Sequence, residues 1–187
     1  HRLVVQLATA YWPILWPAPR PVTLSVVPGR STLHIPTRAE TQGPPPRDLP
    51  EPPDRRGAQA VTRVREGSME RSFHIDLTTG ETTHRYFLDG GVFGPVGDMR
   101  LDDTGTVLGD ISDRTYSIHA DDPLTARATM EQTARFARDD WNVRIWTYAE
   151  QTATETEFHL TARIRCHDGE ELVYEADDSF VIPRNGM

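Results

Sequence analysis

The sequence contains no lysine, and all 20 of its basic residues are arginines. This absence excludes Schiff-base chemistry and a Walker-type phosphate site, because both depend on a lysine amine. With 28 acidic residues the net charge is −8. Nucleic-acid binding requires a clustered basic surface, so no nucleic-acid partner is expected.

Cysteine and long apolar runs are also scarce. Cys166 is the one cysteine, so no disulfide can form within the chain, which fits a reducing, cytoplasmic location. Its alternation with Ile164 and Ala162 favours a small buried side chain over a reactive thiol. No run approaches the ~20 apolar residues of a membrane span, so no membrane association is expected. Neither an initiator methionine nor a signal peptide is visible, which predicts a piece of a longer polypeptide.

Catalytic and metal-binding motifs are missing as well. None of the serines lies in the Gly-x-Ser-x-Gly pattern of a nucleophile elbow, and no histidine pair has zinc-motif spacing. His74 and His84 flank one predicted hairpin and could meet across it, although a satisfied or exposed pair is the better explanation. The loop near residues 90–97 lacks calcium-loop order and is better explained by turn chemistry. The aspartates that surround this glycine-rich loop are Asp98, Asp102, Asp103 and Asp110. The sequence therefore predicts no catalytic residue, no metal and no cofactor.

Proline divides the chain, because twelve of the fifteen prolines precede residue 54. Residues 1–37 read as short strands joined by rigid loops. The predicted strands are 3–7, 22–27 and 31–35, with a turn at 28–30 that makes the last two a hairpin. Residues 38–59 are rich in proline and polar side chains, which predicts an extended linker or strap.

Residues 60–187 predict an antiparallel β domain, because apolar and polar residues alternate along runs that are separated by turn signals. Turns are expected at 78–80, 102–105 and 167–170. In the run 141–150, one face has Trp141, Val143, Ile145, Thr147 and Ala149, and the other has Asn142, Arg144, Trp146, Tyr148 and Glu150. Residues 122–137 begin like a helix at Pro123, but their apolar residues recur with period two. This favours a strand, with a helix as the alternative.

The predicted fold is therefore all-β: an antiparallel sandwich, similar to a jelly roll, with long meandering strands and little helix. Two surfaces mix aromatic and charged residues, one around Trp146 and Tyr148 and one around Glu131. Carbohydrate or protein could bind there. A covering sheet or domain is the favoured explanation.

Residues 11–21 hold two of the four tryptophans and four prolines. A stretch this apolar and rigid needs a packing partner, and the strands after residue 60 have their own faces to bury. We therefore predict that Tyr11, Trp12, Leu15 and Trp16 contact another domain, the proline strap or a neighbouring copy.

The first thirteen residues resemble the C-terminal region of the CocE/NonD hydrolases, the X-Pro dipeptidyl-peptidase and cocaine-esterase-like group. Further motifs are similar to members with a long tail. They are Trp-Pro-x-x-Trp-Pro-x-Pro at 12–19, Asp-Asp-Pro-Leu-x-Ala-Arg at 121–127, Asp-Trp-x-Val-Arg at 140–144 and Ile-Pro-Arg at 182–184. The resemblance spans nearly the whole chain.

The resemblance implies a serine hydrolase with an α/β-hydrolase domain, a helical cap and a β jelly roll. Its Ser, Asp and His would lie upstream of residue 1, so that none of them maps onto this chain. Residues 1–37 would end the jelly roll, and 60–187 would be a further β domain. The expected partner is the catalytic domain of the same parent chain, and the chain could also mediate homo-oligomerisation. The alternative is a stand-alone β-sandwich module that binds carbohydrate or protein.

Overall fold

The computed structural model describes residues 4–36, 60–90 and 96–185. The chain divides into two compact units, one made of His1–Val22 with Gln59–Met187 and the other of Thr23–Ala58. The predicted linker at 38–59 lies outside the described residues. In the described part of the second unit, the Arg30 amide donates to the Val27 carbonyl at 3.2 Å, which confirms the turn at 28–30.

The short strands predicted before residue 37 are wrong for their described residues, because 4–7, 22–27 and 31–35 form no strand. Alternation of apolar residues is only part of what a strand requires. Its backbone N–H and C=O groups must also pair with a neighbouring strand. None of these described segments pairs with another.

The described residues contain nine strands and no helix. The strands are β1 (Val61–Arg65), β2 (Met69–Ile75), β3 (Glu81–Asp89), β4 (Asp98–Leu101), β5 (Thr106–His119), β6 (Asp122–Arg138), β7 (Trp141–Ala153), β8 (Glu157–Asp168) and β9 (Glu171–Pro183). The all-β prediction is confirmed, and the ambiguous run 122–137 is a strand. Among the described residues, no helix is long and apolar enough to cross a membrane.

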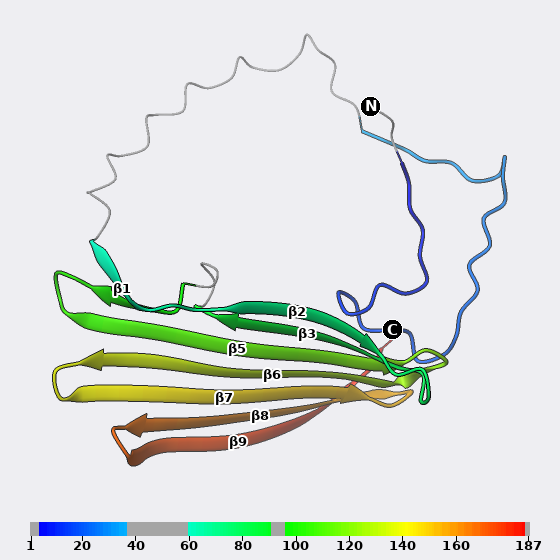
Figure 1. Ribbon diagram of the computed structural model, residues 1–187. Helices are drawn as coiled ribbons and strands as arrows, with labels where there is room; N and C mark the ends of the chain where they lie inside the picture. Colours follow the sequence, from blue (N-terminus) through cyan, green and yellow to red (C-terminus); the bar gives the residue numbers. More distant parts are fainter. Residues whose placement is uncertain (1–3, 37–59, 91–95, 186–187) are drawn as a thin grey trace, which may run out of the picture. The chain divides into compact units, whose positions relative to one another are not determined.

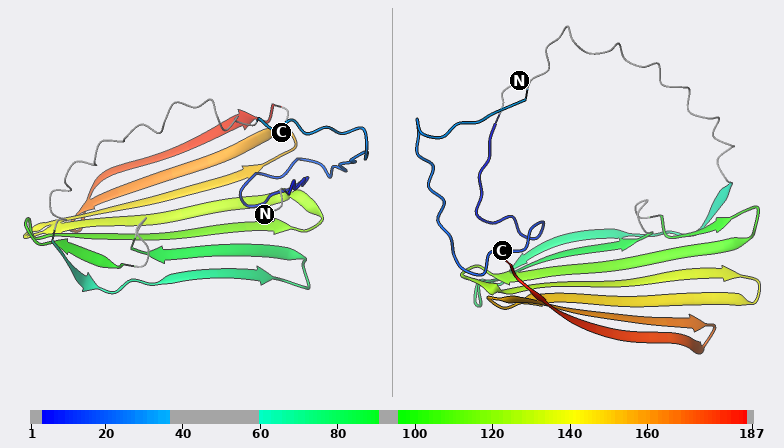
Figure 2. Two further views of the ribbon diagram at one scale, coloured as in Figure 1. Left: turned by 90° about the horizontal axis from the view of Figure 1, so that it is seen from above. Right: turned by 180° about the vertical axis from the view of Figure 1, so that it is seen from behind.

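All nine strands belong to one open antiparallel sheet (Figure 1). Its order is β1-β4-β5-β6-β7-β8-β9, and β2 joins through β3, which also pairs with β5. Strand β5 is long enough to serve two neighbours, since β4 pairs with residues 106–108 and β3 with residues 111–119. Figure 2 shows the sheet as one twisted layer, as expected from the right-handed twist of strands. Such a layer is consistent with one sheet of a sandwich, whereas a jelly roll is not confirmed among the described strands.

Tight turns connect the long strands where the sequence predicts them. The predicted turns at 78–80, 102–105 and 167–170 are confirmed. Gly80, Gly105 and Gly169 have φ angles of 79°, 70° and 57° there, a region that glycine enters without the steric cost of a Cβ atom.

The strand register divides the side chains between two faces of very different character. The apolar face carries Met69, Phe73, Leu88, Leu108, Tyr116, Met130, Phe136, Ile145, Leu160, Ile164 and Phe180. The charged face carries Arg85, Asp113, Arg127, Glu131, Trp146, Tyr148, Glu150, Arg163, Arg165 and Asp177. The alternation predicted for 141–150 is thereby confirmed.

Little of the apolar face is buried. Among the residues of the described strands, the buried apolar side chains are Ala126, Ala153 and Phe158. A sheet normally packs one face against another layer. Here the nine described strands form that one layer only, and most of their apolar face remains accessible.

Candidate functional site

The tryptophan-rich segment at 11–21 packs on the apolar face of the sheet. The Trp12 ring meets Tyr116 of β5 edge to face, with 6.1 Å between ring centres, and Trp16 meets Phe158 of β8 in the same way at 6.0 Å. The two tryptophan rings also contact each other at 5.2 Å. The expectation that the later strands offer no partner for Trp12 and Trp16 is therefore wrong. It assumed a sheet already covered by a second layer, and the apolar face is instead free to receive the segment.

Arg184, just after β9, holds this segment against the sheet. Its guanidinium donates to the Pro17 carbonyl at 2.7 Å and to the Thr154 carbonyl at 2.9 Å. It also lies 4.8 Å from the centre of the Phe158 ring, in a cation–π contact. Only 6% of Arg184 is exposed, and burial lowers its pKa from the ordinary value. The Arg184 side chain therefore connects the segment 11–21 to the end of the sheet where β7 ends and β9 ends.

The four predicted contact residues divide into two groups. Trp12 and Trp16 are half-buried on the sheet. Tyr11 and Leu15 are more exposed, each at 62%. Contact of Tyr11 and Leu15 with another domain remains a prediction, because the described residues leave both side chains uncovered.

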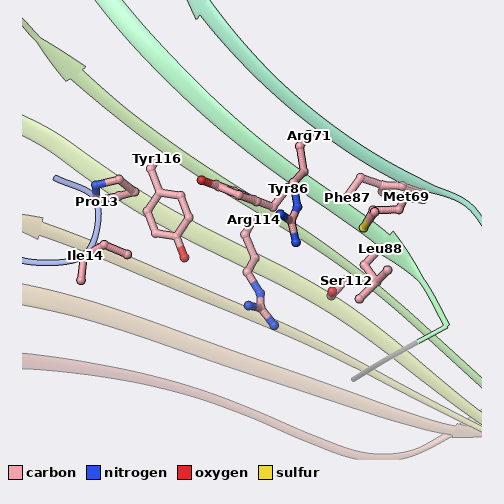
Figure 3. A pocket seen from close by; sticks show the side chains of 10 residues that line it. All are labelled: Pro13, Ile14, Met69, Arg71, Tyr86, Phe87, Leu88, Ser112, Arg114 and Tyr116. Atoms are coloured by element: carbon pink, nitrogen blue, oxygen red, sulfur yellow. The ribbon is translucent and has the colours of Figure 1, made fainter. Parts of the chain in front are cut away.

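A groove of about 280 Å³ runs beside this segment on the apolar face (Figure 3). Pro13 and Ile14 border it from the segment, and Met69 and Leu88 border it from β2 and β3. Ser112 of β5, which is 5% exposed, also lines it. The walls are therefore mostly apolar.

Two arginines interrupt this apolar lining. Arg71 of β2 pairs across the sheet with Tyr86 of β3, and Tyr86 pairs with Arg114 of β5, so the three lie in one cross-strand row. The Arg71 guanidinium lies 5.7 Å from the centre of the Tyr86 ring. The residues that line the groove include no aspartate or glutamate. The groove is thus apolar and locally cationic on a chain of net charge −8.

Ion pairs cross-link the charged face. Arg85 binds Asp113 through its Nε at 3.0 Å, and Arg165 binds Asp177 at 2.6 Å. Arg127 donates two hydrogen bonds of 3.0 Å to Glu150. Such exposed pairs contribute little stability individually, but they leave this face well suited to water.

The aromatic residues of the charged face take part in the same network. The Trp146 and Tyr148 rings are nearly parallel, with an angle of 11° and 6.3 Å between their centres. The Trp146 Nε1 donates to Glu131 at 2.7 Å, and the Tyr148 hydroxyl donates to Glu150. Arg163 lies 5.8 Å from the centre of the Tyr148 ring. The polar groups around the two rings are therefore engaged within the face itself.

Replacing Glu150 with glutamine should remove a small, pH-dependent part of the stability. The Arg127 hydrogen bonds, followed by that of Tyr148, hold the pKa of Glu150 below its ordinary value of 4.5. A lowered pKa stabilises the fold above the unfolded-state pKa, and this contribution is lost as the pH falls through the folded-state pKa. Urea unfolding at neutral pH should show a loss of about 0.5–1 kcal/mol, which vanishes in strong acid. An equal loss of stability at neutral pH and in strong acid would show that the charged form of Glu150 does not contribute to the stability.

The other polar candidates from the sequence are not brought together as metal sites. His84 pairs with Phe73 and His74 with Thr83, so that the two histidines lie on opposite faces of the sheet. Asp98 accepts a 2.6 Å hydrogen bond from Arg65. Among the described residues, no group of three or more His, Cys, Asp or Glu side chains could hold a metal ion.

Comparison of this chain with known proteins gave no match. Neither a family model nor a curated protein matches it, and no solved structure matches it either. The resemblance to the CocE/NonD hydrolases therefore rests on the sequence motifs alone.

Sequence reasoning missed Arg71, Arg114 and Arg184. A signal for Arg114 was present, because it alternates with Ser112 and Tyr116 and so had to share their face. Which face that would be depends on strand pairing, which the sequence does not show. The contact of Arg184 with Pro17 joins residues 167 positions apart, and no local pattern marks it.

Proposed function

We propose that this chain is a non-catalytic β module that docks the catalytic α/β domain of a serine hydrolase, which cleaves amide or ester bonds. The apolar face of the sheet would be the docking surface. The uncovered state of that face carries the proposal, and the sequence motifs shared with the CocE/NonD hydrolases suggest the class of partner.

The amount of exposed apolar surface supports a macromolecular partner. Side chains on strands at both edges of the sheet stay 48–56% exposed, and they are Met69, Phe73, Phe180 and Ile182. Completing the burial of each would contribute about 1 kcal/mol, half of the value for a fully buried large apolar side chain. Contiguous apolar surfaces of this kind mark interaction sites in soluble proteins.

The two faces give the module a defined orientation. The charged face is held in ion pairs such as Arg85–Asp113 and can remain in water, while the apolar face is turned to the partner. Catalytic serine, histidine and aspartate residues would come from the docked domain, in which the serine attacks the carbonyl and backbone amides stabilise the oxyanion. This chain would cover the domain and shape its surroundings through Tyr11 and Leu15.

The alternative, a module that binds carbohydrate, would use the charged face. Trp146 and Tyr148 are the side chains that would stack on a sugar ring. Their neighbours Glu131 and Glu150 already accept hydrogen bonds from them, and Arg163 lies against Tyr148. These groups already have partners within the charged face, whereas the apolar face has none over most of its area, so docking through the apolar face is better supported.

Replacing Ile145 with aspartate tests the docking surface. Ile145 lies on the apolar face, where it pairs with Ala134 of β6 and Cys166 of β8, so that no cation lies opposite the new carboxylate. Burying an unpaired carboxylate in an interface is costly, so we expect affinity for the polypeptide encoded in frame upstream of residue 1 to fall by about 100-fold or more. Isothermal titration calorimetry with the two separately purified parts measures the affinity.

Thr133→Asp is the matched control, since Thr133 lies on the charged face of the neighbouring strand β6 and should retain affinity. Circular dichroism establishes that both variants are folded. Unchanged affinity in Ile145→Asp would contradict the proposal, as would an upstream sequence with no Gly-x-Ser-x-Gly motif.

A further inference from the structure

We infer that the groove bordered by residues 13–14 binds an acidic side chain of the docked polypeptide, with Arg71 and Arg114 as its ion-pair partners. This inference rests on the proposed function and specifies the chemistry of the partner at one point of the interface.

The row formed by Arg71, Tyr86 and Arg114 supplies the geometry. Neighbouring strands lie about 4.8 Å apart, so the backbones at the two arginines are roughly 10 Å apart across β3. Figure 3 shows the two arginine side chains on either side of Tyr86, within the same groove. A carboxylate seated above Tyr86 would therefore lie within reach of both guanidinium groups, and such charge-assisted pairs are the strong ones.

Within the described part of the chain, the two arginines of this row lack the carboxylate partner that arginines such as Arg85 have. On the charged face, arginines such as Arg85 and Arg127 have carboxylate partners. Among the described residues, neither Arg71 nor Arg114 has a carboxylate partner, and the groove has no acidic lining residue. Covering these two guanidinium groups with a purely apolar surface would be costly. The partner should consequently bring a negative charge to this point.

A polypeptide suits the site better than a small molecule. The groove occupies only part of the apolar face, because Met130, Ile145 and Phe180 extend that face well beyond it. A small anion would fill the groove and leave the remaining surface exposed to water. An acidic side chain on a docked polypeptide satisfies the arginines and covers the neighbouring apolar surface together.

Two capped peptides test this chemistry on the whole chain: acetyl-Leu-Glu-Phe-amide and its glutamine counterpart, which differ in one charge. NMR titration of the Met69 and Leu88 methyl groups reports binding in the groove. At low ionic strength and neutral pH, the glutamate peptide should bind about fivefold to tenfold more tightly than the glutamine peptide. The preference should shrink at high salt, because partly exposed charges are screened.

The double substitution Arg71→Met and Arg114→Met should abolish the preference while keeping the side-chain length. Arg144→Met is the matched control, because Arg144 is exposed on the charged face, and it removes a positive charge without altering the groove. Equal binding of the two peptides by the native chain would overturn the inference, and so would a preference that survives in the double variant.

The peptide test and the test of the docking role can succeed or fail independently of each other. If Ile145→Asp abolishes docking but the peptides show no charge preference, the groove inference fails and the docking role stands. If the peptides discriminate as expected but the upstream polypeptide does not associate, the docking role fails and the groove remains an acidic-peptide site.

Discussion

Replacing Gly97 with alanine should destabilise the chain by about 3 kcal/mol, the combined cost of a left-handed alanine and of overpacking. Gly97 has a φ angle of +69°, and an added Cβ would lie 2.1 Å from the Arg65 carbonyl oxygen and 2.5 Å from the Gly67 nitrogen. Both neighbours are backbone atoms, so they cannot rotate away as a side chain would.

Gly97 is sensitive to substitution because the connection between β1 and β2 contacts the residue that precedes β4 at this point. Gly67 lies between β1 and β2, and Gly97 immediately precedes β4. Beside them, Arg65 forms ion pairs with the buried side chains of Asp89 and Asp98. Separating the two connections would pull this triad apart, and a buried carboxylate that loses its cation is expensive.

The variant Gly105→Ala separates the two causes of destabilisation, which are the steric clash of the added Cβ and the left-handed backbone conformation. Gly105 has nearly the same φ angle, +70°, but nothing lies within 4 Å of an added Cβ. It should therefore lose only about 1 kcal/mol, the cost of the left-handed conformation. Urea denaturation of both variants measures the difference. Equal losses would show that the close approach at Gly97 relaxes freely.

Replacing Phe158 with alanine should also cost about 3 kcal/mol, at the lower end of the range for buried aromatic residues. Phe158 is 9% exposed and contacts both the Trp16 ring and the Arg184 guanidinium. Its loss removes the surface on which the segment 11–21 rests. Tryptophan fluorescence should shift to longer wavelength in the same variant, because Trp16 would become accessible to water.

Phe180→Ala is the matched control for this prediction. Phe180 lies on the apolar face of β9 opposite Leu160, but 54% of it is exposed. We expect a loss of about 1 kcal/mol and an unchanged emission maximum. If Phe158→Ala unfolds at the wild-type urea concentration, the packing of Trp16 on the sheet contributes nothing to stability.

Period-two alternation was a reliable guide to the long strands. It distinguished strand from helix at 122–137 against the helix-like start at Pro123, because side chains of a strand alternate between two faces whatever their individual propensities. The same alternation predicted strands at 22–27 and 31–35 and was wrong there. A strand needs a paired neighbour, and the presence of a neighbour is not a property of the segment itself.

The packing of residues 11–21 required the structure as well. Composition showed that this segment must be covered, but the partner residues Tyr116 and Phe158 lie more than a hundred positions away. The groove beside it has the same origin, since Arg71, Tyr86 and Arg114 are brought into one row only by the pairing of β2, β3 and β5. Tyr11 and Leu15 remain predicted contacts.

By itself, the sequence determined the alternation of the long strands after residue 60, the positions of their turns, the acidic charge and the lack of a catalytic motif, because each of these is local or compositional. Tertiary structure alone decided that the described strands form one sheet with an uncovered apolar face. It also decided that Arg184 binds residues 11–21 to this sheet. These features depend on which strands pair and on what covers them. Strand pairing and the covering of the sheet both depend on contacts between residues that are far apart in the sequence, and no local pattern identifies these residues.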